Sequence, residues 1–184
     1  MRPDNLDHLL RAAGDLTGHK RFVLVGSSAI FAWRQAVPEA MAMSREADLF
    51  AADVGDEEVE RLSDVLENIG HLSAFDDTHG YYVDGVGPRT AVLPLDWRVR
   101  SKVYSSPATN GVSAVVPHPE DIALSKLCAG REKDLEWVSA AHDAGFIDLD
   151  RMAVRVPELP GSTAASSAHL LQLIDQIRRR RSRP

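Results

Sequence analysis

A glycine and two serines directly after an apolar run are the first residues with a chemical use. Phe22–Val25 is continuously apolar and predicts a buried strand, and Gly26, Ser27 and Ser28 follow it. Ala29–Arg34 then predicts a short helix. Glycine lets the backbone approach a phosphate closely, hydroxyls donate hydrogen bonds to it, and a helix N-terminus offers free N–H groups. The segment predicts a phosphate-binding turn, although an ordinary tight connection has the same sequence.

Two acidic residues two positions apart form the second candidate. Glu46 precedes Ala47–Ala51, which predicts a short strand, and Asp48 lies within it. Residues i and i+2 of a strand point to the same face, so both carboxylates should project together. Proteins hold Mg²⁺ with one or two carboxylates, and substrate phosphates complete the coordination. The pair predicts a site for Mg²⁺ or Mn²⁺, with solvated charges on an edge strand as the alternative.

A third candidate combines Lys126 with Arg131, Lys133 and Asp134. In one continuous helix the two lysines would share a face with Asp134, but Gly130 favours a break between them. Cations of this kind suit phosphate groups, whereas a solvated helix start has the same composition. The segment therefore indicates a phosphate-binding site only in combination with the two preceding candidates.

The three candidates together resemble the nucleotidyltransferase-like superfamily related to DNA polymerase β. Within it, the chain more closely resembles the bacterial branch around the abortive-infection type E toxins and their uncharacterised relatives. The most specific part is Pro119–Asp134, which contains SKLCAGREKD. Phe75–Pro88 and Thr90–Trp97 also resemble one such subfamily, and the resemblance covers about residues 20–155.

The resemblance implies a reaction and a role for each candidate residue. The Gly-Ser turn would hold the phosphates of a nucleoside triphosphate through Ser27, and Glu46 and Asp48 would hold the metal ion. Lys126 would lie near the triphosphate, and Asp134 would position a metal, the attacking hydroxyl or Lys126. The remaining phosphate-binding candidates are Gly26, Ser28, Arg131 and Lys133.

The chain departs from the superfamily pattern at the acidic residues. Active members usually have aspartate where this chain has Glu46, and the extra methylene displaces the carboxylate by roughly 1.5 Å. Mg²⁺ requires near-ideal octahedral geometry, so this position is either a working variant or the mark of a lost activity. Asp84 and Asp96 are both candidates for the third carboxylate, and Asp96 is the one we assign to the metal site.

Three functions remain open at this stage. The first is transfer of a nucleoside monophosphate from Mg–NTP to an RNA, such as a tRNA, or to a protein hydroxyl, by a toxin or stress effector that has an antitoxin partner. The second is a catalytically degenerate module that binds a nucleotide or a protein. The third is a nucleic-acid-binding regulator that acts through the arginines at positions 178–181 and 183.

The rest of the chain predicts the elements that position these residues. Further helices are expected at Asp4–Ala13, Gly55–Gly70, Pro119–Gly130, Glu132–Ala144, Asp148–Arg155 and Ser162–Arg181. Further strands are expected at Tyr81–Val83, Thr90–Leu93, Trp97–Tyr104 and Val112–Val116. We expect an α/β (α+β) fold, with a small mixed sheet flanked by helices in residues 1–117. A C-terminal helical bundle in residues 118–177 should pack on it, followed by a disordered basic tail, 178–184.

Composition narrows the class of protein further. With 44% hydrophobic and 26% charged residues, the 184-residue chain can form a core. A formal net charge of −6 argues against a generally basic, nucleic-acid-binding surface. Cys128 is the single cysteine, which excludes an internal disulfide. No apolar run approaches the ~18 residues of a membrane span, and no secretory signal is visible, so we expect a cytoplasmic protein.

Overall fold

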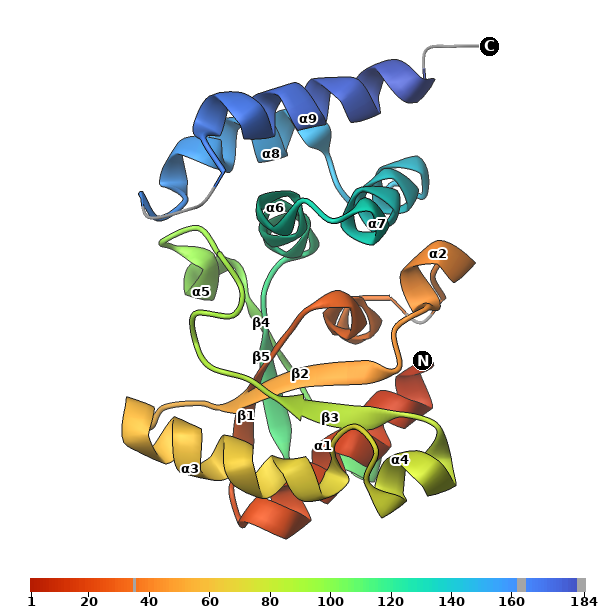
Figure 1. The fold of residues 1–184 in the computed structure, drawn as a ribbon, viewed down its shortest axis with the longest axis vertical. Coiled ribbons are helices and arrows are strands. Elements are labelled where there is room, and N and C mark those ends of the chain that lie inside the picture. Colours follow the sequence, from red (N-terminus) through yellow and green to blue (C-terminus); the bar gives the residue numbers. More distant parts are fainter. Residues whose placement is uncertain (35, 162–164, 182–184) are drawn as a thin grey trace.

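The computed structural model describes residues 1–34, 36–161 and 165–181, and Figure 1 shows its two layers. The lower layer contains a five-stranded mixed sheet in the order β3-β2-β1-β5-β4. The strands are β1 (Arg21–Val25), β2 (Glu46–Ala51), β3 (Tyr82–Gly85), β4 (Lys102–Tyr104) and β5 (Ser113–Val116). β1 is antiparallel to β2 and parallel to β5, and β2 is parallel to β3. The C-terminal end of the central strand β1 therefore lies beside the N-terminal half of β2.

The sheet has an apolar cluster on each face. On one face, Phe22 and Leu24 pack with Leu6 and Leu9 of α1 (Pro3–Thr17). On the other face, Val23 packs with side chains such as Val59 of α3 (Asp56–Leu66). The alternation along β1 thus fills both faces, as expected for a continuously apolar central strand. Shorter helices complete this layer: η1 (Ser27–Ala32), α2 (Glu39–Ala42), η2 (Glu67–Ile69), α4 (Ala74–His79) and η3 (Pro107–Thr109).

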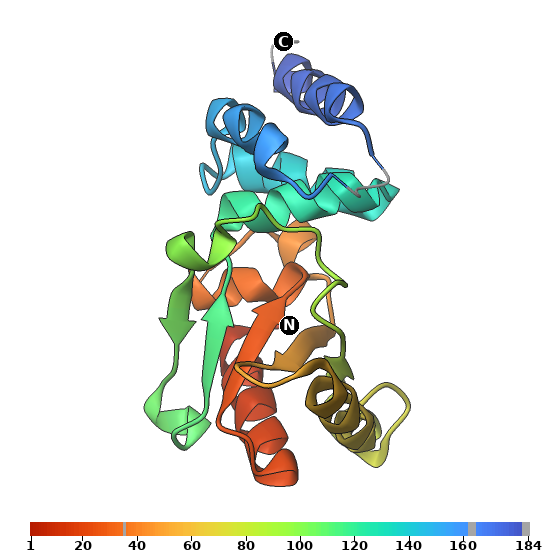
Figure 2. The ribbon, with the colours of Figure 1, turned by 90° about the vertical axis from the view of Figure 1, so that its left-hand side faces the viewer.

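A layer of helices lies over one end of the sheet. It consists of α5 (Trp97–Arg100), α6 (Pro119–Ala129), α7 (Glu132–Asp143), α8 (Leu149–Arg155), η4 (Val156–Glu158) and α9 (Ser167–Arg181). Figure 2 shows α6 lying across the end of the sheet, with α8 and α9 beyond it. Leu124 and Leu127 of α6 belong to the same apolar cluster as Phe22 and Leu24. The helical layer and the sheet therefore share one core, and among the described residues no helix is long and apolar enough to cross a membrane.

The predicted mixed α/β fold is confirmed, with local exceptions. Thr90–Leu93 is not a strand, and the predicted strand Trp97–Tyr104 divides into α5 and β4. Helix α4 was not expected from the sequence. The helix expected at Ser162–Arg181 is present as α9, and it includes Arg178–Arg181, which were also assigned to the basic tail; residues 162–164 and 182–184 lie outside the described residues.

Gly14 lies inside α1. The helix expected at Asp4–Ala13 continues to Thr17 and ends at Gly18, whose φ is +72°. A Cβ on Gly14 would lie 2.3 Å from Cγ2 of Val112. Gly14 therefore allows α1 to approach the segment that leads into β5.

Candidate functional site

The turn after β1 places the chain against an acidic side chain of the neighbouring strand. Gly26 has φ 71° and ψ −163°, a conformation that is essentially restricted to glycine. A Cβ at this position would lie 1.7 Å from Oδ2 of Asp48. The antiparallel register pairs Val25 with Asp48, which explains the close approach. The glycine thus lets the Asp48 carboxylate lie directly on the turn where η1 begins.

Carboxylates from two parallel strands meet at this turn. Glu46 and Asp48 share a face of β2, and the parallel register places Asp84 of β3 opposite Asp48. Tyr82 lies opposite Glu46, and its hydroxyl donates a hydrogen bond of 3.1 Å to Glu46 Oε2. Sequence reasoning left Asp84 open as a third acid, and the strand pairing brings it to the group.

Asp96 does not join these carboxylates, contrary to its assignment to the metal site. It precedes α5 and forms an ion pair of 2.5 Å with Arg155. The guanidinium hydrogen bond from Arg155 lowers the pKa of Asp96. A structural ion pair between the α5 turn and α8 therefore accounts for this acid.

Burial and the closeness of the acids raise the pKa values of Asp48 and Asp84. Burial, together with the neighbouring charges of Glu46 and Asp84, raises the pKa of Asp48 to about 7 against the opposing effect of Lys126 and Arg131. The pKa of Asp84 is also raised, first by burial and then by Glu46. Among the described residues, no group of three or more His, Cys, Asp and Glu side chains forms a ready-made metal site. The acids therefore offer a partial ligand set that a substrate would have to complete.

Cationic side chains from α6 and α7 face the acids. Lys126 Nζ donates to Ser27 Oγ at 2.8 Å and to Asp134 Oδ1 at 3.0 Å. Arg131 Nε donates to Asp134 Oδ2 at 2.6 Å. Gly130 has φ 65° and turns the chain between the two helices, so that Arg131 and Asp134 return toward Lys126. Asp134 is 0% exposed and Lys126 is 8% exposed, so the ammonium group is held in a fixed position.

Burial acts oppositely on the two members of this ion pair. Desolvation lowers the pKa of Lys126, although Asp134 counteracts the effect. Burial alone would raise the pKa of Asp134, but hydrogen bonds from Arg131 and Lys126 hold it below its usual value. The pair thus keeps Asp134 ionised and Lys126 anchored beside Ser27.

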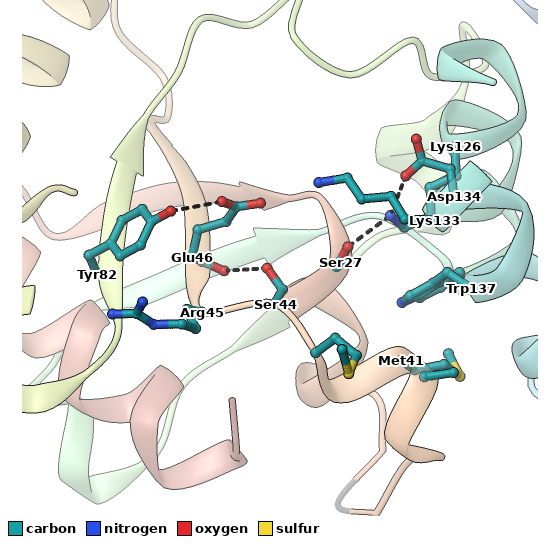
Figure 3. Close-up of a pocket in the computed structure, with 12 residues that line it drawn as sticks. Ser27, Met41, Ser44, Arg45, Glu46, Tyr82, Lys126, Lys133, Asp134 and Trp137 are labelled. Atoms are coloured by element: carbon teal, nitrogen blue, oxygen red, sulfur yellow. Dashed lines mark hydrogen bonds and ion pairs between the residues drawn. The ribbon is translucent and has the colours of Figure 1, made fainter. Parts of the chain in front are cut away.

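Two adjoining cavities open on these groups. The first, here the carboxylate cavity, has a volume of about 550 Å³ and is lined by Gly26, Ser27, Glu46, Asp48, Asp84, Thr90–Val92, Lys126, Arg131 and Lys133, among others. The second, here the methionine cavity, has a volume of about 270 Å³ and is lined by Ala40, Met41, Met43, Tyr82 and Trp137, among others. Figure 3 shows the second cavity, with Lys126 joined to Ser27 and Asp134 and with Tyr82 joined to Glu46.

Ser28 differs from its predicted role, and Tyr82 was missed. The side chain of Ser28 is buried, its Oγ has no hydrogen-bond partner among the described residues, and it lines neither cavity. Because η1 begins at Ser27, the next side chain turns into the core. The sequence signal for Tyr82 was its place two residues before Asp84 on a predicted strand.

The family of the chain agrees with this combination of acids and cations. The chain belongs to the family described as "nucleotidyltransferase of unknown function (DUF6036)", whose model matches residues 4–171. Comparison with curated proteins and with solved structures finds no match to the chain. The matched residues include the sheet, both cavities and most of the helical layer.

Proposed function

We propose that this protein transfers a nucleoside monophosphate from a nucleoside triphosphate to a hydroxyl group of an RNA or a protein. The observation that carries the proposal is the carboxylate cavity. Its acids (Glu46, Asp48 and Asp84) lie on the sheet, and its cations (Lys126, Arg131 and Lys133) come from the helices. Acids that suit a divalent cation and cations that suit phosphates are what this transfer requires at one site.

The acidic side chains fit Mg²⁺ or Mn²⁺. Glu46 and Asp48 would hold the ion, because both offer carboxylate oxygens from one face of β2 and substrate phosphates can supply further ligands. Burial and then repulsion from Glu46 raise the pKa of Asp48, and a bound cation would offset both effects. The bound ion would neutralise negative charge on the triphosphate. Tyr82 fixes the longer Glu46 side chain, which supports a working variant of the usual aspartate.

The side chains divide the work of the transfer. Ser27, Lys126, Arg131 and Lys133 would bind the phosphates and stabilise the charge of the departing group. The acceptor oxygen forms a bond to the α-phosphorus as the bond from that phosphorus to the α,β-bridging oxygen breaks. The hydroxyl proton passes to the carboxylate of Asp84, which lines the cavity, and pyrophosphate leaves. The products are pyrophosphate and a nucleotidylated acceptor.

Label transfer tests this proposal. Purified protein is incubated with α-labelled nucleoside triphosphates, Mg²⁺ or Mn²⁺, and total tRNA or a cell lysate. The wild-type protein should label an acceptor, Asp48→Asn should not, and Asp96→Asn should behave as wild type because Asp96 pairs with Arg155 outside the site. Wild-type labelling no greater than that of Asp48→Asn would overturn the proposal.

The resemblance to the abortive-infection type E toxins supports a role in growth arrest with an antitoxin partner. Expression of the wild-type chain should then arrest bacterial growth, and expression of Asp48→Asn should not. We place this action in the cytoplasm, where nucleoside triphosphates and tRNA are found. Equal growth of both strains would contradict the toxin role while leaving nucleotidyl transfer open.

A catalytically degenerate nucleotide-binding module is the second candidate function. Two observations favour it: Glu46 replaces the usual aspartate, and Lys126 is already hydrogen-bonded to Ser27. Calorimetry with Mn²⁺ and each nucleoside triphosphate separates the two functions. Binding with no label transfer to any acceptor indicates the module, and binding with transfer indicates the enzyme.

A further inference from the structure

The two cavities share the residues that would hold a triphosphate. Ser27, Glu46, Lys126 and Lys133 line both of them. A nucleotide whose phosphates lie on these residues can therefore place its base in either cavity. The acceptor must then approach through the cavity that the base does not occupy.

The position of Asp84 assigns the acceptor to one side. Asp84 lines the carboxylate cavity and is absent from the lining of the methionine cavity. A group that takes the proton of an attacking hydroxyl must lie within hydrogen-bond reach of it. The acceptor hydroxyl consequently enters through the carboxylate cavity, which is the larger of the two and borders the Thr90–Val92 loop.

The walls of the methionine cavity suit a flat aromatic group. Met43 supplies an exposed, flexible thioether and Met41 a buried one, and thioethers adapt to irregular shapes and contact aromatic rings favourably. Tyr82 adds aromatic surface, and the buried Trp137 forms part of the wall, with Lys126 Nζ 5.1 Å from the centroid of its ring. With a volume of about 270 Å³, the cavity accommodates one small ligand.

Trp137 also offers an unused hydrogen-bond donor. Its side chain is 2% exposed, and its indole N–H has no partner among the described residues. In Figure 3 the nitrogen of the indole is turned toward the interior of the pocket. The nitrogen is covered in the free protein, so a ligand reaches it only when a wall side chain shifts. Methionine side chains are flexible, so such a shift costs little free energy.

We infer that the methionine cavity binds the base and ribose of the nucleoside triphosphate, with the phosphates on Ser27 and Lys126 and the acceptor in the carboxylate cavity. This inference rests on the proposed function. An acceptor atom of the base would take the Trp137 N–H, and Met41 and Met43 would cover the face of the base. The nucleoside and the acceptor would thereby be bound on opposite sides of Glu46.

Binding measurements with and without a base test the inference. The probes are ATP, GTP, CTP, UTP and inorganic tripolyphosphate, each titrated with Mn²⁺ by calorimetry. Trp137→Phe removes the N–H and keeps an aromatic ring, and Met43→Ala removes a wall side chain that is 73% exposed. Val154→Ala, also on an exposed apolar residue but in α8, is the matched control.

The inference expects a loss that depends on the base. Trp137→Phe should weaken binding of at least one nucleoside triphosphate by about three- to tenfold while tripolyphosphate binding stays unchanged. Met43→Ala should weaken nucleotide binding in the same selective way, and Val154→Ala should leave all probes unaffected. Because Met43 is exposed, its variant decides the question if Trp137→Phe fails to fold.

Two results would overturn the inference and leave the proposed function intact. One is an equal loss for nucleotides and tripolyphosphate, which would place phosphates in the methionine cavity. The other is unchanged nucleotide binding in both variants together with a loss in Ala91→Leu, which narrows the carboxylate cavity. If the wild-type protein binds neither nucleotides nor tripolyphosphate, the proposed function fails as well.

Discussion

Helix α6 carries a buried ion network at each end, and the two networks differ in their balance of charge. Near its N-terminus, Arg100 donates to Asp121 at 3.0 Å and to Glu120 at 2.5 Å. Arg155 donates to Asp121 at 3.1 Å and to Asp96 at 2.5 Å. Acids here outnumber arginines, and both guanidinium groups are used to join α5 and α8 to α6.

The network at the C-terminal end of α6 has the opposite balance. Asp134 is its one acid, and it faces Lys126 and Arg131, with Lys133 on the same cavity wall. Excess positive charge therefore faces the cavity, where phosphates would lie. A buried network whose cations are all paired with acids joins elements of the fold, whereas a network with an excess of cationic charge is suited to binding an anion.

The largest effect should follow from breaking the structural network. Arg100→Met leaves Asp121, which is 0% exposed, without one of its two arginines. Loss of one partner of a buried pair typically costs about 3–5 kcal/mol. Urea denaturation should show a loss of this size in the free energy of unfolding, with label transfer per folded molecule unchanged. An unchanged free energy of unfolding in this variant would show that the N-terminal network does not stabilise the fold.

Breaking the other network should instead affect activity. Lys126→Met keeps the length of the side chain and removes the charge beside Ser27, while Arg131 remains on Asp134. Loss of one group that stabilises developing charge typically lowers kcat about 100-fold or more. The unfolding midpoint should change less than in Arg100→Met. A variant with full transfer activity and reduced stability would reverse the contrast between the two ends of α6.

The sequence predicted the parts of the site that depend on local spacing. Gly26 and Ser27 follow a strand whose apolar run is visible, and Glu46 and Asp48 share a face by strand periodicity alone. Lys126 and Asp134 lie eight positions apart, and their contact needs only the turn at Gly130. These are short-range relations, which the order of residues determines.

The parts that were missed depend on long-range pairing. Asp84 reaches the site because β3 pairs with β2 in parallel, and this register joins residues 36 positions apart. Without the register, Asp84 and Asp96 are equivalent candidates. Trp97–Arg100 alternates as a strand does, yet it forms a helical turn in which Val99 is 85% exposed. There, tertiary contacts such as Arg100 with Asp121 outweigh the local pattern.

The acids of the cavity should make the stability of the protein depend on pH in a characteristic direction. The pKa of Asp48 in the folded protein, about 7, exceeds its ordinary value of 3.8. Between these values the folded state binds more protons, so stability falls as pH rises from about 4 to about 7. Coupling of this titration to that of Asp84, whose pKa is also raised, reduces the effect to about 2 kcal/mol.

Urea denaturation across this pH range, with Asp48→Asn as the control, checks the effect. The variant lacks the titrating group, so its stability should depend less on pH, and the two curves should diverge toward neutral pH with the variant the more stable. Addition of Mn²⁺ should reduce the divergence, because a bound cation favours the ionised acid. Parallel curves for the two proteins would contradict the raised pKa.

The smallest effect should come from Tyr82, which acts on the site only through Glu46. Tyr82→Phe removes the hydrogen bond to Glu46 Oε2 and leaves the ring in place. A hydrogen bond to a charged group contributes about 1.5–3 kcal/mol at most, and the freed carboxylate is partly solvated, so we expect Mn²⁺ affinity to fall about fivefold. Glu46→Asp should remove the same contact by shortening the side chain, and the double variant should then bind Mn²⁺ no more weakly than Glu46→Asp alone. Additive losses in calorimetric titrations would show instead that Tyr82 acts independently of Glu46, and the longer acid would then have no dedicated support on β3.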